Sequence, residues 1–163
     1  MSIMSIFRNG ELTPAEYSGE VADYSRRADA ARTDDRPGRV GSLYAAPTLE
    51  SATRWTIANL GLMGNPTETY ELRVDPDKVY VYPIELWEAF SWRNVSPSEY
   101  WEAGIPLSEY VSGGYEKDSE YEVLLRPSDI ISYRRVSKKR LLDHVPEFNR
   151  NEMAHLLKRY KIK

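Results

Sequence analysis

The chain has 163 residues, of which 41% are hydrophobic and 29% are charged, and it contains no cysteine. This length fits one domain with its own core, and the composition is that of an ordinary globular protein. The missing cysteines exclude disulfides, zinc–cysteine sites and thiol nucleophiles. The first ten residues lack the basic segment and apolar core of a secretory signal, and no apolar run approaches the ~20 residues of a membrane helix. We therefore expect a cytoplasmic protein.

The net charge of −3 is distributed unevenly along the chain. Residues 134–163 contain ten Lys/Arg and three Asp/Glu, a net charge of +7, which leaves −10 for residues 1–133. This asymmetry has two interpretations: a solvated amphipathic helix, or a surface for an anionic partner such as RNA or DNA. The two histidines, His144 and His155, stand 11 residues apart near the C-terminus, which is a poor arrangement for a metal site, so we predict no metal site.

Hydrophobic periodicity predicts the elements of the first half of the chain. Residues 2–8 alternate well enough for a first strand. Thr13 as a cap and Pro14 at the first helical position predict the start of a polar helix. A short strand is expected over residues 40–46. Apolar side chains at helical spacing then predict a helix over residues 47–64.

The second half of the chain is predicted to be mostly β-structure. Residues 67–84 contain two alternating strands around a turn at Asp75–Lys78, and residues 120–137 contain two more around a turn at Arg126–Asp129. Residues 96–118 have two Pro, three Gly and no clear period, which predicts a long loop. An amphipathic helix is expected over residues 149–160. This order of elements predicts a single α+β domain over the whole chain.

Familiar catalytic motifs are absent from the sequence. It has no glycine-rich phosphate loop, no nucleophile elbow and no paired metal-binding carboxylates. Three short motifs remain. They are "IFRNG", an apolar strand ending in Arg8; "GSLYAAPTLESATRW", a strand leading into a helix; and "EYEVLL", two glutamates entering an apolar strand. Taken alone, the two glutamates are also compatible with a charged strand edge in solvent.

Together these motifs resemble the mono-ADP-ribosyltransferases, a family of NAD-using toxins and their relatives. The resemblance spans residues 7–136. It implies two small mixed or antiparallel sheets around an NAD cleft, with flanking helices. It also implies cleavage of the bond between ribose and nicotinamide, followed by transfer of ADP-ribose to an acceptor. An arginine side chain of a protein, a nucleic acid and a small molecule are all possible acceptors.

The resemblance assigns a role to five residues. Arg8 would hold the diphosphate or ribose of NAD through forked hydrogen bonds, and Tyr44 would pack against nicotinamide. Ser42 is the nearest match to the family serine, although this chain has "SLYAA" where many members have consecutive Ser/Thr. Glu122 would stabilise the oxocarbenium-like transition state through the ribose 2′-hydroxyl. Glu120, two residues earlier on the same strand face, would orient or deprotonate the acceptor.

The segment before the glutamates is the expected target-recognition loop, with Tyr115 as its aromatic contact. The resemblance suggests a toxin or effector, which a separate machine could deliver into a target cell's cytoplasm, and an antitoxin or immunity protein as a partner. Two alternatives stay open. One is an NAD glycohydrolase with water as the acceptor, and the other is a non-catalytic binding module on the same scaffold.

Overall fold

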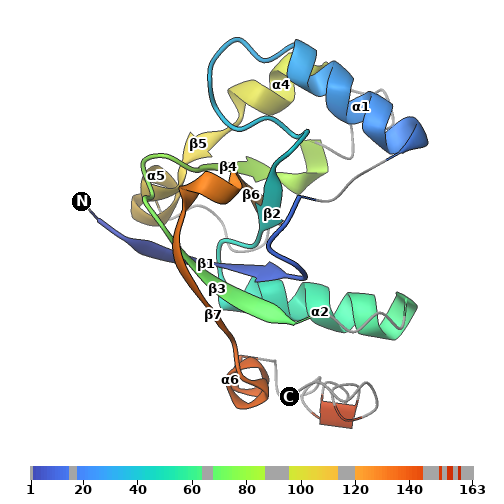
Figure 1. Cartoon of the computed structure of the whole chain (residues 1–163), viewed down its shortest axis with the longest axis vertical. Coiled ribbons are helices and arrows are strands. Elements are labelled where there is room, and N and C mark those ends of the chain that lie inside the picture. The colour runs from blue at the N-terminus through green and yellow to red at the C-terminus, as the bar shows by residue number, and fades with distance from the viewer. Residues whose placement is uncertain are drawn as a thin grey trace.

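The computed structural model describes residues 2–14, 18–63, 68–86, 96–113, 120–144, 151, 154–155 and 158 (Figure 1). The strands are β1 (Met4–Asn9), β2 (Leu43–Ala45), β3 (Thr69–Val74), β4 (Tyr80–Pro83), β5 (Ile105–Pro106), β6 (Tyr121–Leu125) and β7 (Ile130–Arg135). The helices are α1 (Gly19–Ala30), α2 (Leu49–Met63), α4 (Pro97–Glu102), α5 (Leu107–Ser112) and α6 (Lys138–Asp143), with a 3-10 turn η1 (Pro127–Asp129). The predicted α+β class is confirmed.

The strands form two antiparallel sheets. Sheet A has the order β1-β3-β7, and sheet B has the order β2-β6-β4-β5. In sheet B, Tyr44 lies opposite Leu124, and Tyr82 lies opposite Glu122. Because paired residues share a sheet face and alternate residues along a strand do too, these four side chains lie on one face of sheet B.

Two turns carry the chain from one sheet to the other. The turn after β3 leads from sheet A to β4 in sheet B, and η1 leads from β6 in sheet B to β7 in sheet A. Asp75 accepts a hydrogen bond from the backbone N–H of Asp77 (3.0 Å), and Asp129 accepts one from Arg126 N–H (2.7 Å). Both turns were predicted at these positions, but they are corners between sheets rather than hairpins.

The largest apolar cluster lies between the two sheets. Its buried members come from both of them: Ile6, Leu43, Ala45, Leu72, Val74, Val79, Val81, Leu107, Val123 and Leu125. Such alternation of inward apolar side chains is the ordinary way in which two sheets form a shared core. In the described residues, the two sheets therefore share an apolar core.

The outer faces of the sheets are covered by helices. A second cluster joins Phe7 of β1 to Leu49 and Ala52 of α2 and to Leu141 of α6. A third cluster, around Leu124 and Tyr82 on the outer face of sheet B, contains Ala28 of α1 and Tyr100 and Trp101 of α4. In Figure 1, α1 and α4 lie together at the top, and α2 and α6 lie toward the bottom.

Some predicted boundaries are wrong, and the causes are local. The first helix begins at Gly19, not near Thr13, because Gly19 has φ = 63°, a left-handed conformation that a continuous right-handed helix cannot contain. Residues 96–113 are not a loop but form α4, β5 and α5. Their prolines stand where a helix tolerates them: Pro97 is in the first turn of α4, and Pro106 directly precedes α5.

The predicted C-terminal helix falls mostly outside the described residues. Of the predicted range 149–160, residues 151, 154, 155 and 158 are described, and all four are helical.

Candidate functional site

Glu122 is a buried carboxylate on the outer face of sheet B. The residue is 7% exposed although it lies near the start of β6. Its Oε1 atom forms an ion pair with Nη1 of Arg39 and accepts a hydrogen bond from the Tyr100 hydroxyl at 2.9 Å. A buried charge requires such partners, because isolating it from water is otherwise costly. Glu122 is therefore not part of a solvated strand edge.

Arg39 is the centre of this arrangement and was not predicted from the sequence. It lies in the connection between α1 and β2, where Asp29 accepts hydrogen bonds from the backbone N–H groups of Arg39 (2.7 Å) and Val40 (3.0 Å). Its guanidinium lies over the rings of Tyr44 (4.7 Å) and Tyr100 (5.4 Å). Burial alone would lower the pKa of Arg39, but the neighbouring Glu122 carboxylate raises it above its usual range. Arg39 therefore stays charged.

Tyr44 and Ser42 both contact the segment that carries Arg39. The Tyr44 hydroxyl donates to the Arg39 carbonyl at 2.8 Å, while its ring receives the Arg39 guanidinium. The Ser42 hydroxyl donates to the carbonyl of Gly38. Ser42 is buried, and Tyr44 is partly buried against the third cluster. Both side chains thus fix the Arg39 segment in the described conformation.

Arg8 reaches the same region from the end of β1. Its Nη1 donates to the Tyr44 carbonyl at 2.8 Å, and its Nε donates to the carbonyl of Glu11 at 2.5 Å. Arg8 therefore joins sheet A to β2 of sheet B. Of the predicted residues, Tyr44 and Glu122 contact Arg39 directly. Arg8 and Ser42 bond the neighbouring backbone carbonyls of Tyr44 and Gly38.

The two glutamates of the "EYEVLL" motif have different surroundings. Glu122 is buried, whereas Glu120 directly precedes β6 and is exposed. The Glu120 carbonyl accepts a hydrogen bond from Ile84 N–H at 3.0 Å, which fixes the backbone there. Tyr115, the predicted recognition residue, lies outside the described residues. The site thus has one buried carboxylate, that of Glu122, and one exposed carboxylate, that of Glu120.

Aromatic rings pack together on the same face of sheet B as Glu122. Tyr82 and Tyr100 stack with their centroids 4.6 Å apart, and Trp101 meets Tyr82 edge-on at 5.5 Å. The Trp101 indole N–H donates to the carbonyl of Ala28 at 2.6 Å, which ties α4 to α1. Burial raises the pKa of Tyr82 to about 12 and that of Tyr100 well above its usual range. Both phenols are therefore neutral near neutral pH.

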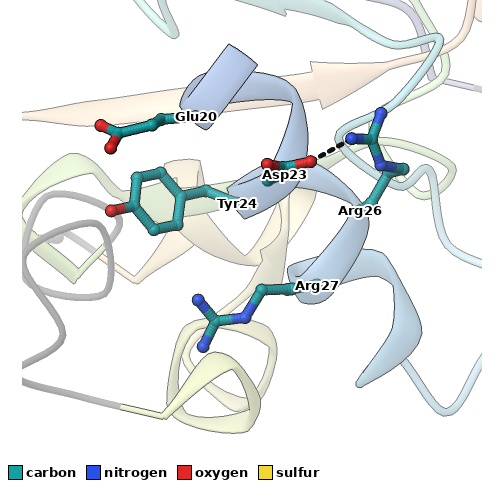
Figure 2. A pocket seen from close by; sticks show the side chains of 5 residues that line it. All are labelled: Glu20, Asp23, Tyr24, Arg26 and Arg27. Atoms are coloured by element: carbon teal, nitrogen blue, oxygen red, sulfur yellow. Dashed lines mark hydrogen bonds and ion pairs between the residues drawn. The ribbon is translucent and has the colours of Figure 1, made fainter. Parts of the chain in front are cut away.

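Three hollows lined by described residues lie away from this network. One of about 390 Å³ follows α1 and is lined by Glu20, Asp23, Tyr24, Arg26 and Arg27 (Figure 2). Asp23 and Arg26 form an ion pair there. The others, of about 470 Å³ and 250 Å³, lie beside β7 and beside the two inter-sheet turns. In this conformation, none of the three is lined by Arg39, Tyr100 or Glu122.

In the described part of the chain, no three or more acidic or histidine side chains are grouped so that they could hold a metal ion. No helix there has the length and apolar character needed to cross a membrane.

Comparison with known protein families, with curated proteins and with solved structures found no match. The site is accordingly interpreted from its own geometry and from the motifs of the chain.

Proposed function

We propose that this protein is an NAD-dependent mono-ADP-ribosyltransferase with Glu122 as its central catalytic residue. The observation that carries the proposal is the network itself. Tyr44 of β2 and Glu122 of β6 meet around the buried guanidinium of Arg39, and Arg8 of β1, in the other sheet, donates to the Tyr44 carbonyl. Three motifs that lie far apart in the sequence are thus close together in the fold.

Glu122 has surroundings that suit its proposed role. Cleavage of the nicotinamide–ribose bond builds positive charge on the ribose, and a carboxylate held nearby stabilises that charge. The stabilisation is stronger in a site that excludes water, because the effective dielectric constant is lower there. Glu122 is fixed by β6 on one side and by Tyr100 on the other. Such rigid support is what a catalytic carboxylate requires.

The exposed Glu120 suits contact with an acceptor. A carboxylate in solvent beside the buried one can meet an incoming guanidinium or hydroxyl without a desolvation penalty. Three basic side chains of residues 134–140 are already paired with acidic ones: Arg134 and Arg140 with Glu71, and Arg135 with Glu68. This internal pairing favours a protein acceptor of the arginine type over a nucleic acid. A toxin or effector role in the cytoplasm, held in check by an antitoxin or immunity protein, is part of the proposal.

The test is nicotinamide release from NAD, measured with and without an arginine-rich protein acceptor. Glu122→Gln keeps the size of the side chain and is expected to lower the rate by about 100-fold or more, as the loss of a central electrostatic group does. Glu99→Gln, the same change at an exposed residue of α4, is the matched control and should leave the rate unchanged. Equal rates for Glu122→Gln and wild type would overturn the proposal. Release that does not depend on the acceptor would instead identify an NAD glycohydrolase.

One observation favours a second candidate, a non-catalytic binding module. The Glu122 carboxylate is already neutralised by Arg39 and bonded to Tyr100, so the network is a stable structural unit without any ligand. In that case NAD would bind without being cleaved, or would not bind at all. Isothermal titration with NAD, performed beside the nicotinamide assay, separates the two candidates.

A further inference from the structure

The ion pair at the centre of the site poses a problem for the proposed chemistry. The Glu122 oxygen nearest to Arg39 is the same Oε1 atom that accepts the Tyr100 hydroxyl. The Glu122 residue is also only 7% exposed, and none of the three hollows described above is lined by it. The described conformation is therefore a closed state of the site, in which a ribose cannot reach the carboxylate unless the pair rearranges.

We infer that Arg39 exchanges partners when a diphosphate-containing ligand binds: the diphosphate replaces Glu122 on the guanidinium and so releases the carboxylate. This inference rests on the proposed function, because the freed carboxylate then faces the ribose of the same ligand. Arg39 is in this case a binding residue for the diphosphate, and Glu122 stays sequestered until that ligand is present.

The exchange has a physical basis in charge compensation. A guanidinium that is 7% exposed cannot lose its carboxylate partner without another anion in its place. A diphosphate carries more charge than a carboxylate and matches the forked donors of arginine. The rings of Tyr44 and Tyr100 retain the guanidinium by cation–π contact while its anionic partner changes. Binding of the anion and release of Glu122 are therefore thermodynamically coupled.

The position of Arg39 in the chain makes such a change feasible. The next residue, Val40, is 58% exposed, so the buried guanidinium is attached to a backbone that lies at the surface. Gly41 follows with φ = 75°, a conformation that favours glycine. Asp29 holds the backbone N–H groups of this turn. The turn can thus stay anchored by its backbone while the anionic partner of the Arg39 side chain changes.

The test uses inorganic pyrophosphate as the probe, titrated calorimetrically into the full chain. Glu122→Gln removes the competing charge and should bind pyrophosphate about tenfold more tightly than wild type, within the usual range of coupling between sites. Pyrophosphate should also raise the melting temperature of Glu122→Gln more than that of wild type, because it compensates the buried Arg39 charge. Glu99→Gln is the matched control and should bind as wild type does. Equal affinity of Glu122→Gln and wild type would overturn the exchange.

Arg39→Lys gives a second, independent measurement if Glu122→Gln does not fold. Lysine keeps the positive charge opposite Glu122 but lacks the fork, so pyrophosphate affinity should fall about tenfold; unchanged affinity would overturn the exchange. The two proposals fail in different ways. If the pyrophosphate results hold but no nicotinamide is released from NAD, the exchange stands and the transferase proposal fails. If nicotinamide is released but these affinities do not differ, the transferase proposal stands and the exchange fails.

Discussion

Two strand glutamates are buried with arginine partners, and their surroundings differ. Glu122 of β6 pairs with Arg39, which is itself only 7% exposed. Glu71 of β3 is 5% exposed but pairs with surface side chains, Arg134 of β7 and Arg140 of α6, which are 71% and 36% exposed. At Glu122 both charges are removed from water, whereas at Glu71 the positive charges stay largely hydrated.

We call Glu71 with Arg134 and Arg140 the clamp, because these ion pairs hold elements together, and Glu122 with Arg39 the closed site, because both of its charges are buried. The arginines at Glu71 fasten β7 and α6 to the centre of sheet A, and their hydration makes the arrangement inexpensive. The pair at Glu122 joins two elements that other contacts already hold: Asp29 fixes the Arg39 backbone, and sheet pairing fixes β6. A buried pair is weak evidence for stability, and these elements do not need the Glu122 pair to hold them together. The Glu122 pair is therefore the better candidate for function.

The largest expected effect on stability comes from removing Arg39. Arg39→Met fills similar space but leaves Glu122 buried without a cation, which should destabilise the fold by about 3–5 kcal/mol. Urea unfolding followed by circular dichroism measures this. Arg26→Met removes an arginine from an exposed pair with Asp23 and should cost less than about 0.5 kcal/mol. A similar small cost for Arg39→Met would mean that Glu122 is not dependent on its partner.

The next largest effect is expected at Gly104, which lies against the Tyr82 ring near Glu122. A Cβ atom at this position would lie 2.2 Å from Cε1 of Tyr82. Tyr82 is fully buried and stacked on Tyr100. Tyr82 therefore cannot move without disturbing Tyr100, whose hydroxyl is bonded to Glu122. Gly104→Ala should therefore destabilise the fold by about 1–3 kcal/mol. In a Tyr82→Leu background, the cost of Gly104→Ala should shrink; an unchanged cost would place the strain elsewhere.

Much of the fold could be predicted from periodicity alone. β2, β3, β4, β6 and β7 lie within the segments expected to be strands, and β1 extends one residue beyond its predicted end. The allocation of strands to sheets could not be predicted, because a turn sequence specifies a local bend and not the partner of the strand that follows. Segment 96–118 was predicted to be a loop because its two prolines and three glycines leave no clear period, although both prolines stand at helix starts.

The candidate site was predictable only in part. Glu122, Tyr44, Ser42 and Arg8 stand in short motifs, and the structure brings them into one network. Arg39 and Tyr100 stand in no such pattern. Both contact Glu122, which is 83 positions from Arg39 and 22 positions from Tyr100 in the sequence. Such long-range pairing depends on the tertiary fold.

A moderate effect, dependent on pH, is expected at Glu71. Hydrogen bonds from Arg140, followed by those from Arg134, lower the pKa of Glu71 from 4.5 to about 2, against the opposing effect of burial. The stabilisation is therefore fully present above about pH 4.5 and is lost as the pH falls toward 2. Glu71→Gln should cost about 1–2 kcal/mol at pH 7, after allowance for screening of the exposed arginines. Across pH 4.5 to 2, the stability of this variant should fall less steeply than that of wild type; parallel pH profiles would contradict the assignment.

The smallest effects are expected from the two arginines of the clamp taken singly. Arg140 is the less exposed of the two, lies with its guanidinium 5.5 Å from the Phe7 ring, and contributes most to lowering the pKa of Glu71. Arg140→Gln should therefore cost about 1 kcal/mol and Arg134→Gln about 0.5 kcal/mol, both within the range of exposed ion pairs. Because the two share Glu71, a double-mutant cycle should show coupling. A cost of several kcal/mol for either variant would mean that Glu71 depends on its arginine partners as strongly as Glu122 does on Arg39. The distinction between the clamp and the closed site would then fail.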